Sequence, residues 1–106
     1  MPDFTDMLSK AKAMQAKMKE AQDAIKNIEV EGQAGGNLVK VILTGDYEIK
    51  AINVSEEAKK ETIEVINDLI IAAYNNAKEK IKKRSSEELS KVTGGLNLPF
   101  DLKFPF

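Results

Sequence analysis

Residues 28–54 read IEVEGQAGGNLVKVILTGDYEIKAINV, and this stretch decides the fold. It holds three segments of strand character: residues 28–31 alternate apolar and acidic side chains, residues 38–43 are rich in β-branched types, and residues 47–54 resume the pattern. Gly-Gly-Asn and Thr-Gly-Asp separate the segments. Short strands joined by glycine-centred turns predict an antiparallel meander of three strands over residues 28–54.

The glycines of this stretch, Gly32, Gly35 and Gly36, suggest a phosphate-binding loop at first sight. Such a loop needs a following Gly-Lys-Ser/Thr or a helix that begins at once, and neither is present. We therefore interpret all three as turn formers.

On the amino-terminal side, residues 1–28 predict one long helix. Its apolar residues follow a three-and-four spacing typical of a heptad seam, and no Gly or Pro interrupts it after Pro2. The seam is narrow, which favours a helix packed on the sheet of its own chain; pairing with a second chain is the alternative. The seam residues are Phe4, Met7, Ala11, Met14, Met18, Ala21, Ile25 and Ile28.

On the carboxyl-terminal side, residues 56–93 predict a helical region with the richest apolar face of the chain. This seam ends at Ala77, because the same spacing then meets Lys80, Arg84 and Glu87. We expect the helix to continue as an arm in solvent, with a kink or restart where Ser85-Ser86-Glu87-Glu88 resembles a capping box. Thr93-Gly94-Gly95 ends it.

The composition limits the function. A chain of 106 residues fits one α+β domain with a thin core, which dimerisation would help to stabilise. The chain has no His and no Cys, which removes a Ser-His-Asp triad, a cysteine nucleophile and a conventional zinc site. No acid, base and nucleophile converge, so we expect no enzyme, cofactor, metal or small-molecule substrate. No apolar run is long enough to span a membrane, and the acidic start is unlike a secretory signal, which predicts a cytoplasmic protein.

The net charge is −1, and the distribution of charge matters more than its sum. Lysines are concentrated on the two helices, where they suit contacts to phosphates without reading sequence. Taken alone, composition favours a solvated helix face over a binding site. The candidate DNA-binding residues are Lys10, Lys12, Lys17, Lys19, Lys78, Lys80, Lys82, Lys83, Arg84 and Lys91.

Residues 94–106, GGLNLPFDLKFPF, form an apolar tail. Its apolar side chains alternate from Leu96 to Phe106, so an extended segment presents one apolar edge. Pro99 and Pro105 discourage long strand pairing. We interpret the tail either as a segment docked in a groove of the same or a neighbouring dimer, or as flexible.

Five segments in order resemble the YbaB/EbfC family of bacterial nucleoid-associated DNA-binding proteins. They are Met14-Gln15-Ala16-Lys17-Met18, the run from Val30 to Gly36, Leu38-Val39-Lys40-Val41, the run from Asp68 to Ala77, and the run from Thr93 to Pro99. The resemblance covers nearly the whole of residues 1–106 as one domain.

The resemblance implies a homodimer, built through the sheet and second helix, whose protruding helices hold double-stranded DNA in the nucleoid. An interaction protein that uses its helical arms and apolar tail to bind protein partners is the alternative function. Candidate dimer-interface residues are Val39, Val41, Leu43, Ile63, Ile66, Leu69, Ile70, Ala73 and Tyr74.

Overall fold

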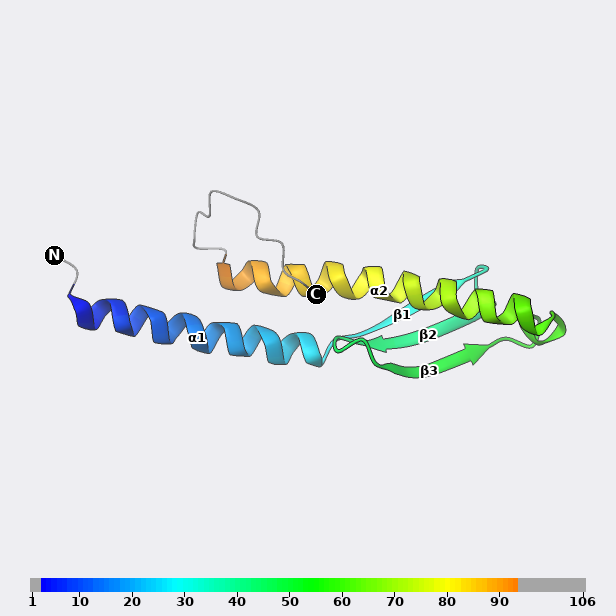
Figure 1. The fold of residues 1–106 in the computed structure, drawn as a ribbon, viewed down its shortest axis with the longest axis horizontal. Helices are drawn as coiled ribbons and strands as arrows, with labels where there is room; N and C mark the ends of the chain where they lie inside the picture. Colours follow the sequence, from blue (N-terminus) through cyan, green and yellow to red (C-terminus); the bar gives the residue numbers. More distant parts are fainter. Residues whose placement is uncertain (1–2, 94–106) are drawn as a thin grey trace.

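The chain folds into a long helix, a three-stranded sheet and a second long helix (Figure 1). The computed structural model describes residues 3–93, so the predictions for the tail at 94–106 lie outside the described residues. The elements are, in order, α1 (Phe4–Lys26), β1 (Glu29–Ala34), β2 (Val39–Thr44), β3 (Ile49–Val54), the 3₁₀ turn η1 (Ala58–Lys60) and α2 (Ile63–Thr93). The α+β class and the order of elements are confirmed.

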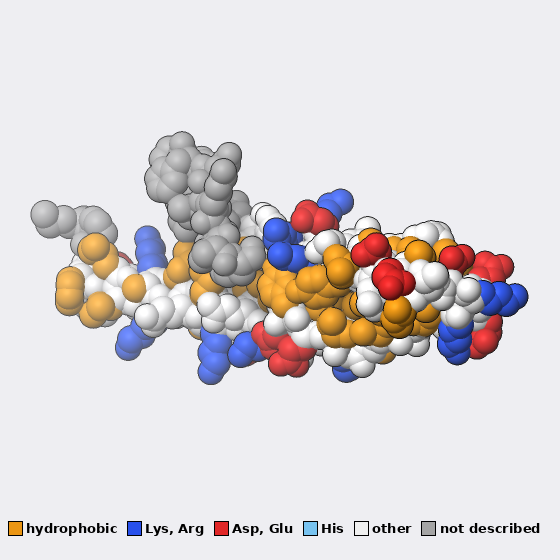
Figure 2. All heavy atoms as spheres, turned by 45° about the vertical axis from the view of Figure 1, so that its right-hand side comes forward, with side chains coloured by type: hydrophobic (Ala, Val, Ile, Leu, Met, Phe, Trp, Pro, Cys, Tyr) orange, Lys and Arg blue, Asp and Glu red, His pale blue; other side chains and the backbone are white. Residues whose placement is uncertain are grey.

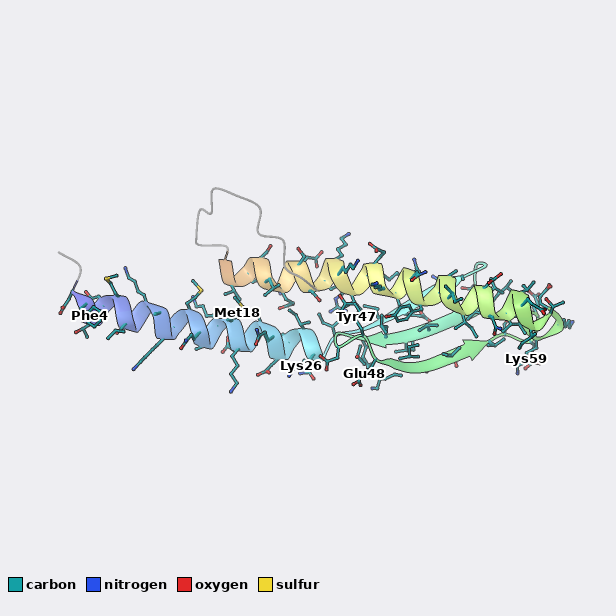
Figure 3. The ribbon with its side chains drawn as sticks, in the orientation of Figure 1. Phe4, Met18, Lys26, Tyr47, Glu48 and Lys59 are labelled. Atoms are coloured by element: carbon teal, nitrogen blue, oxygen red, sulfur yellow. The ribbon has the colours of Figure 1, made fainter. Side chains whose placement is uncertain are left out.

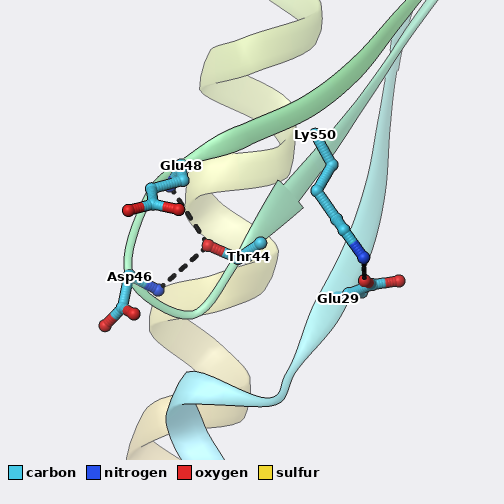
Figure 4. Close-up of polar contacts among 5 residues, drawn as sticks. All are labelled: Glu29, Thr44, Asp46, Glu48 and Lys50. Carbon is cyan, nitrogen blue, oxygen red and sulfur yellow. Dashed lines mark hydrogen bonds and ion pairs between the residues drawn. The ribbon is translucent and has the colours of Figure 1, made fainter.

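The sheet is the antiparallel meander that the sequence predicts, in the order β1-β2-β3. Val30 pairs with Leu43 and Val41 pairs with Ile52, so these four side chains share one face. The turn between β2 and β3 is organised by the Thr44 hydroxyl, which accepts hydrogen bonds from the backbone N–H of Asp46 at 3.3 Å and of Glu48 at 3.2 Å (Figure 4).

The helix α2 covers one face of the sheet over β1 and β2. Val39, Val41 and Leu43 are fully buried beneath it. Gly32 lies inside β1 and not in a turn, which corrects the sequence interpretation. A Cβ at this position would overlap the backbone of α2 at Ala73 and Ala77, so Gly32 allows the helix to lie directly on the sheet. Gly35 and Gly36 do form the turn, both with positive φ.

The helix α1 packs on the second half of α2, and not on the sheet as expected. The apolar seam of α2 also does not stop at Ala77. It continues at intervals of four residues through Ile81, Ser85 and Leu89, which are all buried. Since α2 is one uninterrupted helix, the expected kink at Ser85-Ser86 is absent from it. The second half of α2, which was expected to extend alone into solvent, therefore packs against α1 as an antiparallel pair of helices.

The pair of helices joins the sheet at Gly45, in the turn after β2. Its backbone N–H donates to the carbonyl of Ile28 at 2.9 Å. A Cβ on Gly45 would overlap the Ile25 carbonyl, so only glycine permits the end of α1 to cross here. This close crossing fixes the direction in which α1 leaves the sheet.

Candidate nucleic-acid interface

Charge is segregated along the molecule, whose principal extents are 71 × 24 × 17 Å. We call α1 together with residues 77–93 of α2 the helical pair, and residues 27–76 the sheet end. The helical pair carries eleven basic and six acidic side chains, a net charge of +5. The sheet end carries four basic and nine acidic side chains, a net charge of −5. A polyanion is therefore attracted to one end and repelled from the other.

The lysines of α1 form two rows along the helix, one on each side of its apolar seam. Lys10 and Lys17 are seven residues apart, as are Lys12, Lys19 and Lys26. Seven residues are close to two helical turns, so each row lies on one side of the helix. Figure 2 shows lysines projecting on both sides of α1. Lys26 was not among the predicted site residues, although its seven-residue spacing from Lys19 was the available signal.

These candidate lysines of α1 are not engaged elsewhere in the part of the chain that the structure describes. Within residues 3–93, Lys10, Lys12, Lys17 and Lys19 make no hydrogen bond or ion pair. Their ammonium groups are exposed and available to phosphates.

Two basic residues of α2 have a structural partner instead. Lys80 donates to the Glu31 carbonyl at 2.7 Å, and Arg84 donates to the Glu29 carbonyl at 3.5 Å. Asn76, four residues before Lys80, accepts a hydrogen bond from the backbone N–H of Gln33 at 3.1 Å. This row of three side chains pairs with the outer edge of β1. An edge strand needs such partners because its backbone groups are otherwise unpaired.

The other basic candidates of α2 have only weak surface ion pairs or no partner among the described residues. Lys82 pairs with Glu79 at 3.8 Å and Lys91 pairs with Glu88 at 3.1 Å, both on the surface and three residues apart. Such pairs are worth little and open readily. Among the described residues, Lys78 and Lys83 have no partner. A hollow of about 340 Å³ lies between the two helices. Lys17 and Lys91 line it, together with Glu20 and Glu88.

The candidate dimer-interface residues divide into two groups. Val39, Val41, Leu43 and Ala73 are fully buried between the sheet and α2 of a single chain, where they form its core. A second chain can reach them only if α2 leaves the sheet. The others are exposed or half-buried on α2: Ile63, Ile66, Leu69, Ile70 and Tyr74.

An apolar surface remains where α2 leaves β3 uncovered. Ile49 and Ile52 lie on the same sheet face as the core, yet they are 47% and 44% exposed. On α2, Ile63 and Ile71 are 64% and 59% exposed. They lie on the flank that also carries Ile70 and Tyr74, and Tyr74 lies near Tyr47 in the turn before β3. We call the exposed residues Ile49, Ile52, Ile63 and Ile71 the β3 strip.

The opposite face of the sheet is polar. Lys40 pairs with Glu31 at 3.5 Å, and Lys50 pairs with Glu29 across β2 (Figure 4). Within residues 3–93, no cluster of three potential metal-ligating side chains occurs. No helix in this part of the chain is long and apolar enough to cross a membrane.

Comparison with known proteins gives consistent results. A family model described as the YbaB/EbfC DNA-binding family matches residues 1–96. The nucleoid-associated protein mlr5504 of Mesorhizobium japonicum is 42% identical over 107 residues, with 100% of both chains covered. The nucleoid-associated protein Atu0095 of Agrobacterium fabrum is 41% identical with the same coverage.

A solved structure supports the fold alone. The uncharacterized protein HP0035 from Helicobacter pylori superposes with a TM-score of 0.71 at 15% sequence identity. The superposition covers 87% of this chain and 98% of that one.

Proposed function

The chain belongs to the YbaB/EbfC DNA-binding family, and from this premise we propose that it binds double-stranded DNA at the nucleoid, in the cytoplasm, through phosphate contacts from its helical pair. The observation that carries the proposal is the segregation of charge, with lysines on the positive end that have no partner within residues 3–93. Lysines at phosphates position a protein but do not distinguish bases. The chain has one arginine, Arg84, whose guanidinium is held at the β1 edge. Bidentate recognition of guanine relies mainly on arginine side chains, so we expect this chain to show weak sequence preference.

Fluorescence anisotropy of a labelled random-sequence duplex, titrated across a salt series, tests this proposal. Affinity should fall log-linearly with salt, with a slope of about −0.9 for each phosphate contacted. Lys12→Gln/Lys19→Gln should weaken binding and reduce the magnitude of the slope by about 2 for each bound chain.

The matched control is Lys59→Gln/Lys60→Gln, which changes the net charge equally at the sheet end. It should leave the slope unchanged. If the two double variants reduce the magnitude of the salt slope equally, or if neither affects DNA binding, the proposed interface is wrong.

We further propose that two chains associate through the β3 strip. The strip exposes four large apolar side chains, each between 44% and 64% exposed, on the acidic sheet end. A contiguous exposed apolar surface of this kind marks an interaction site. The edge of β1 is occupied by α2, whereas β3 has one free edge within the described residues, so this side is open to a partner. A twofold dimer here places a positive helical pair on each side of the assembly.

Light scattering coupled to gel filtration tests the dimer. Ile52→Asp should reduce the mass from two chains to one, because it places a charge in the centre of the interface. Asn53→Asp, one residue along on the polar face, should leave the dimer intact. A wild-type chain that elutes with the mass of one chain contradicts this proposal without affecting the DNA test.

A further inference from the structure

The outer part of α1 has an apolar face that the described residues leave uncovered. The heptad seam runs without interruption from Phe4 to Ile25, yet burial along it is uneven. Ala21 is buried and Met14 and Met18 are half-buried, whereas Phe4 is 71% exposed and Met7 is 60% exposed. Figure 3 shows Met18 opposite the end of α2 and Phe4 beyond it.

The face is uncovered because α2 ends too early. The two helices are antiparallel, since Ser85 faces Ile25 whereas Val92 faces Lys17 and Ala21. From Lys17 outward to Phe4, the seam continues for about 20 Å without a partner helix among the described residues. At its carboxyl-terminal end the axis of α2 points toward the outer half of α1 (Figure 1).

The residues that follow Thr93 are long enough to reach the outer end of this seam, and their pattern of apolar side chains suits it. At least thirteen residues follow, and in an extended conformation they span roughly 43 Å. Six of them are apolar and alternate in sequence, so an extended segment has one apolar edge: Leu96, Leu98, Phe100, Leu102, Phe104 and Phe106. This edge is long enough to cover the whole exposed seam.

We propose that the chain beyond Thr93 lies along the outer seam of α1 of the same chain, where residues 96–100 take over from α2 as its partner. In this position the segment covers Phe4 and Met7. It leaves the two rows of lysines free, because they lie on either side of the seam. A simple count of rise per residue places Leu98 beside Met7.

Disulfide trapping tests this arrangement directly, because the chain has no cysteine of its own. In the full chain, Met7→Cys/Leu98→Cys should oxidise within one chain several-fold faster than Ser9→Cys/Leu98→Cys. Ser9 lies two residues away on the opposite side of α1, so both pairs have the same tether and differ only in the face.

Peptide mass spectrometry and the mass on a non-reducing gel identify the product. Equal oxidation rates for the two pairs would show that the segment has no preferred face. A product that joins two chains would show that the segment covers the helix of a second copy. Either result overturns the proposal, and neither depends on DNA binding.

Hydrogen exchange provides a second measurement without added cysteines. Leu98→Ser/Phe100→Ser should speed exchange of the amides at residues 8–14 several-fold and leave those of β2 unchanged. Asn97→Ser, between Leu96 and Leu98 on the other edge of the same segment, should have no effect. Unchanged exchange in α1 with the first variant would overturn the proposal.

Discussion

Tyr47 combines two costs at one position in the turn after β2. Its backbone has φ of 62°, in the left-handed region that non-glycine residues rarely occupy. Its hydroxyl is buried and, among the described residues, has no hydrogen-bond partner. The ring offsets these costs because it packs against the core cluster that contains Leu43 and Ile81. The aromatic ring therefore stabilises this site, while the hydroxyl does not.

Burial raises the pKa of Tyr47 above 10.0, and the neighbouring Tyr74 and Glu79 raise it further. Because the folded state holds the proton more tightly than the unfolded state, this contribution to stability is complete below pH 10. It is lost as the pH rises through the folded pKa.

We therefore expect Tyr47→Phe to remove part of the alkaline loss of stability. At pH 7 it should be neutral, or stabilising by up to about 1 kcal/mol, because a buried hydroxyl without a partner is removed. Urea unfolding at pH 7 and between pH 9 and 11 measures both effects. Tyr74→Phe is the control, and it should retain most of the alkaline loss.

At the scale of elements, two of the three side chains that join α2 to the edge of β1, Lys80 and Arg84, were predicted from the sequence to bind DNA. Asn76, Lys80 and Arg84 lie at intervals of four on one side of α2 and meet successive polar groups of β1. They hold the helix to the strand, and they also block that edge against another strand.

Lys80→Met/Arg84→Met tests this structural role, because methionine keeps the apolar stem and removes the donor. We expect a loss of about 1 kcal/mol in the free energy of unfolding, measured with urea. Lys78→Met/Lys83→Met removes the same charge without a β1 contact and should cost less than about 0.5 kcal/mol. Equal losses in the two variants would assign the effect to charge alone.

The elements themselves were predictable, and their packing was not. The β-branched runs and Gly35-Gly36 identify the meander because they act locally. The end of the α2 seam was misplaced because Ser85 is polar. A small residue buried where two helices meet leaves no hydrophobic signal, although Ile81 and Leu89 are each four residues away.

The same limit applies to the candidate site. Gly32 resembles a turn residue in the sequence, and only the packing of α2 shows that it permits a close contact. Lys80 and Arg84 are indistinguishable from Lys83 as members of a basic run, because their backbone partners lie about fifty positions away in the sequence. The rows of lysines on α1 were accessible because their spacing is local.

At the scale of the whole molecule, the two charged ends are separated along an axis of 71 Å. The Debye length is about 10 Å at 0.1 M salt and about 30 Å at 0.01 M. The acidic sheet end therefore acts on DNA bound at the helical pair only when salt is low.

We expect Glu57→Gln/Glu61→Gln, at the far tip of the sheet end, to leave DNA affinity unchanged at 0.1 M salt. At 0.01 M the same variant should bind more tightly, because less long-range repulsion remains. Anisotropy titrations at the two salt concentrations measure this difference. Tighter binding at 0.1 M salt would place the sheet end next to the DNA, contrary to the proposed interface.

The segregation of charge also affects what a covered duplex presents to its surroundings. If the positive helical pairs face the phosphates, the acidic sheet ends with their net charge of −5 point outward. Protein bound along the duplex then forms a sheath whose outer surface is again anionic. Neighbouring sheathed duplexes would then repel one another, and the bound DNA would stay dispersed instead of condensing.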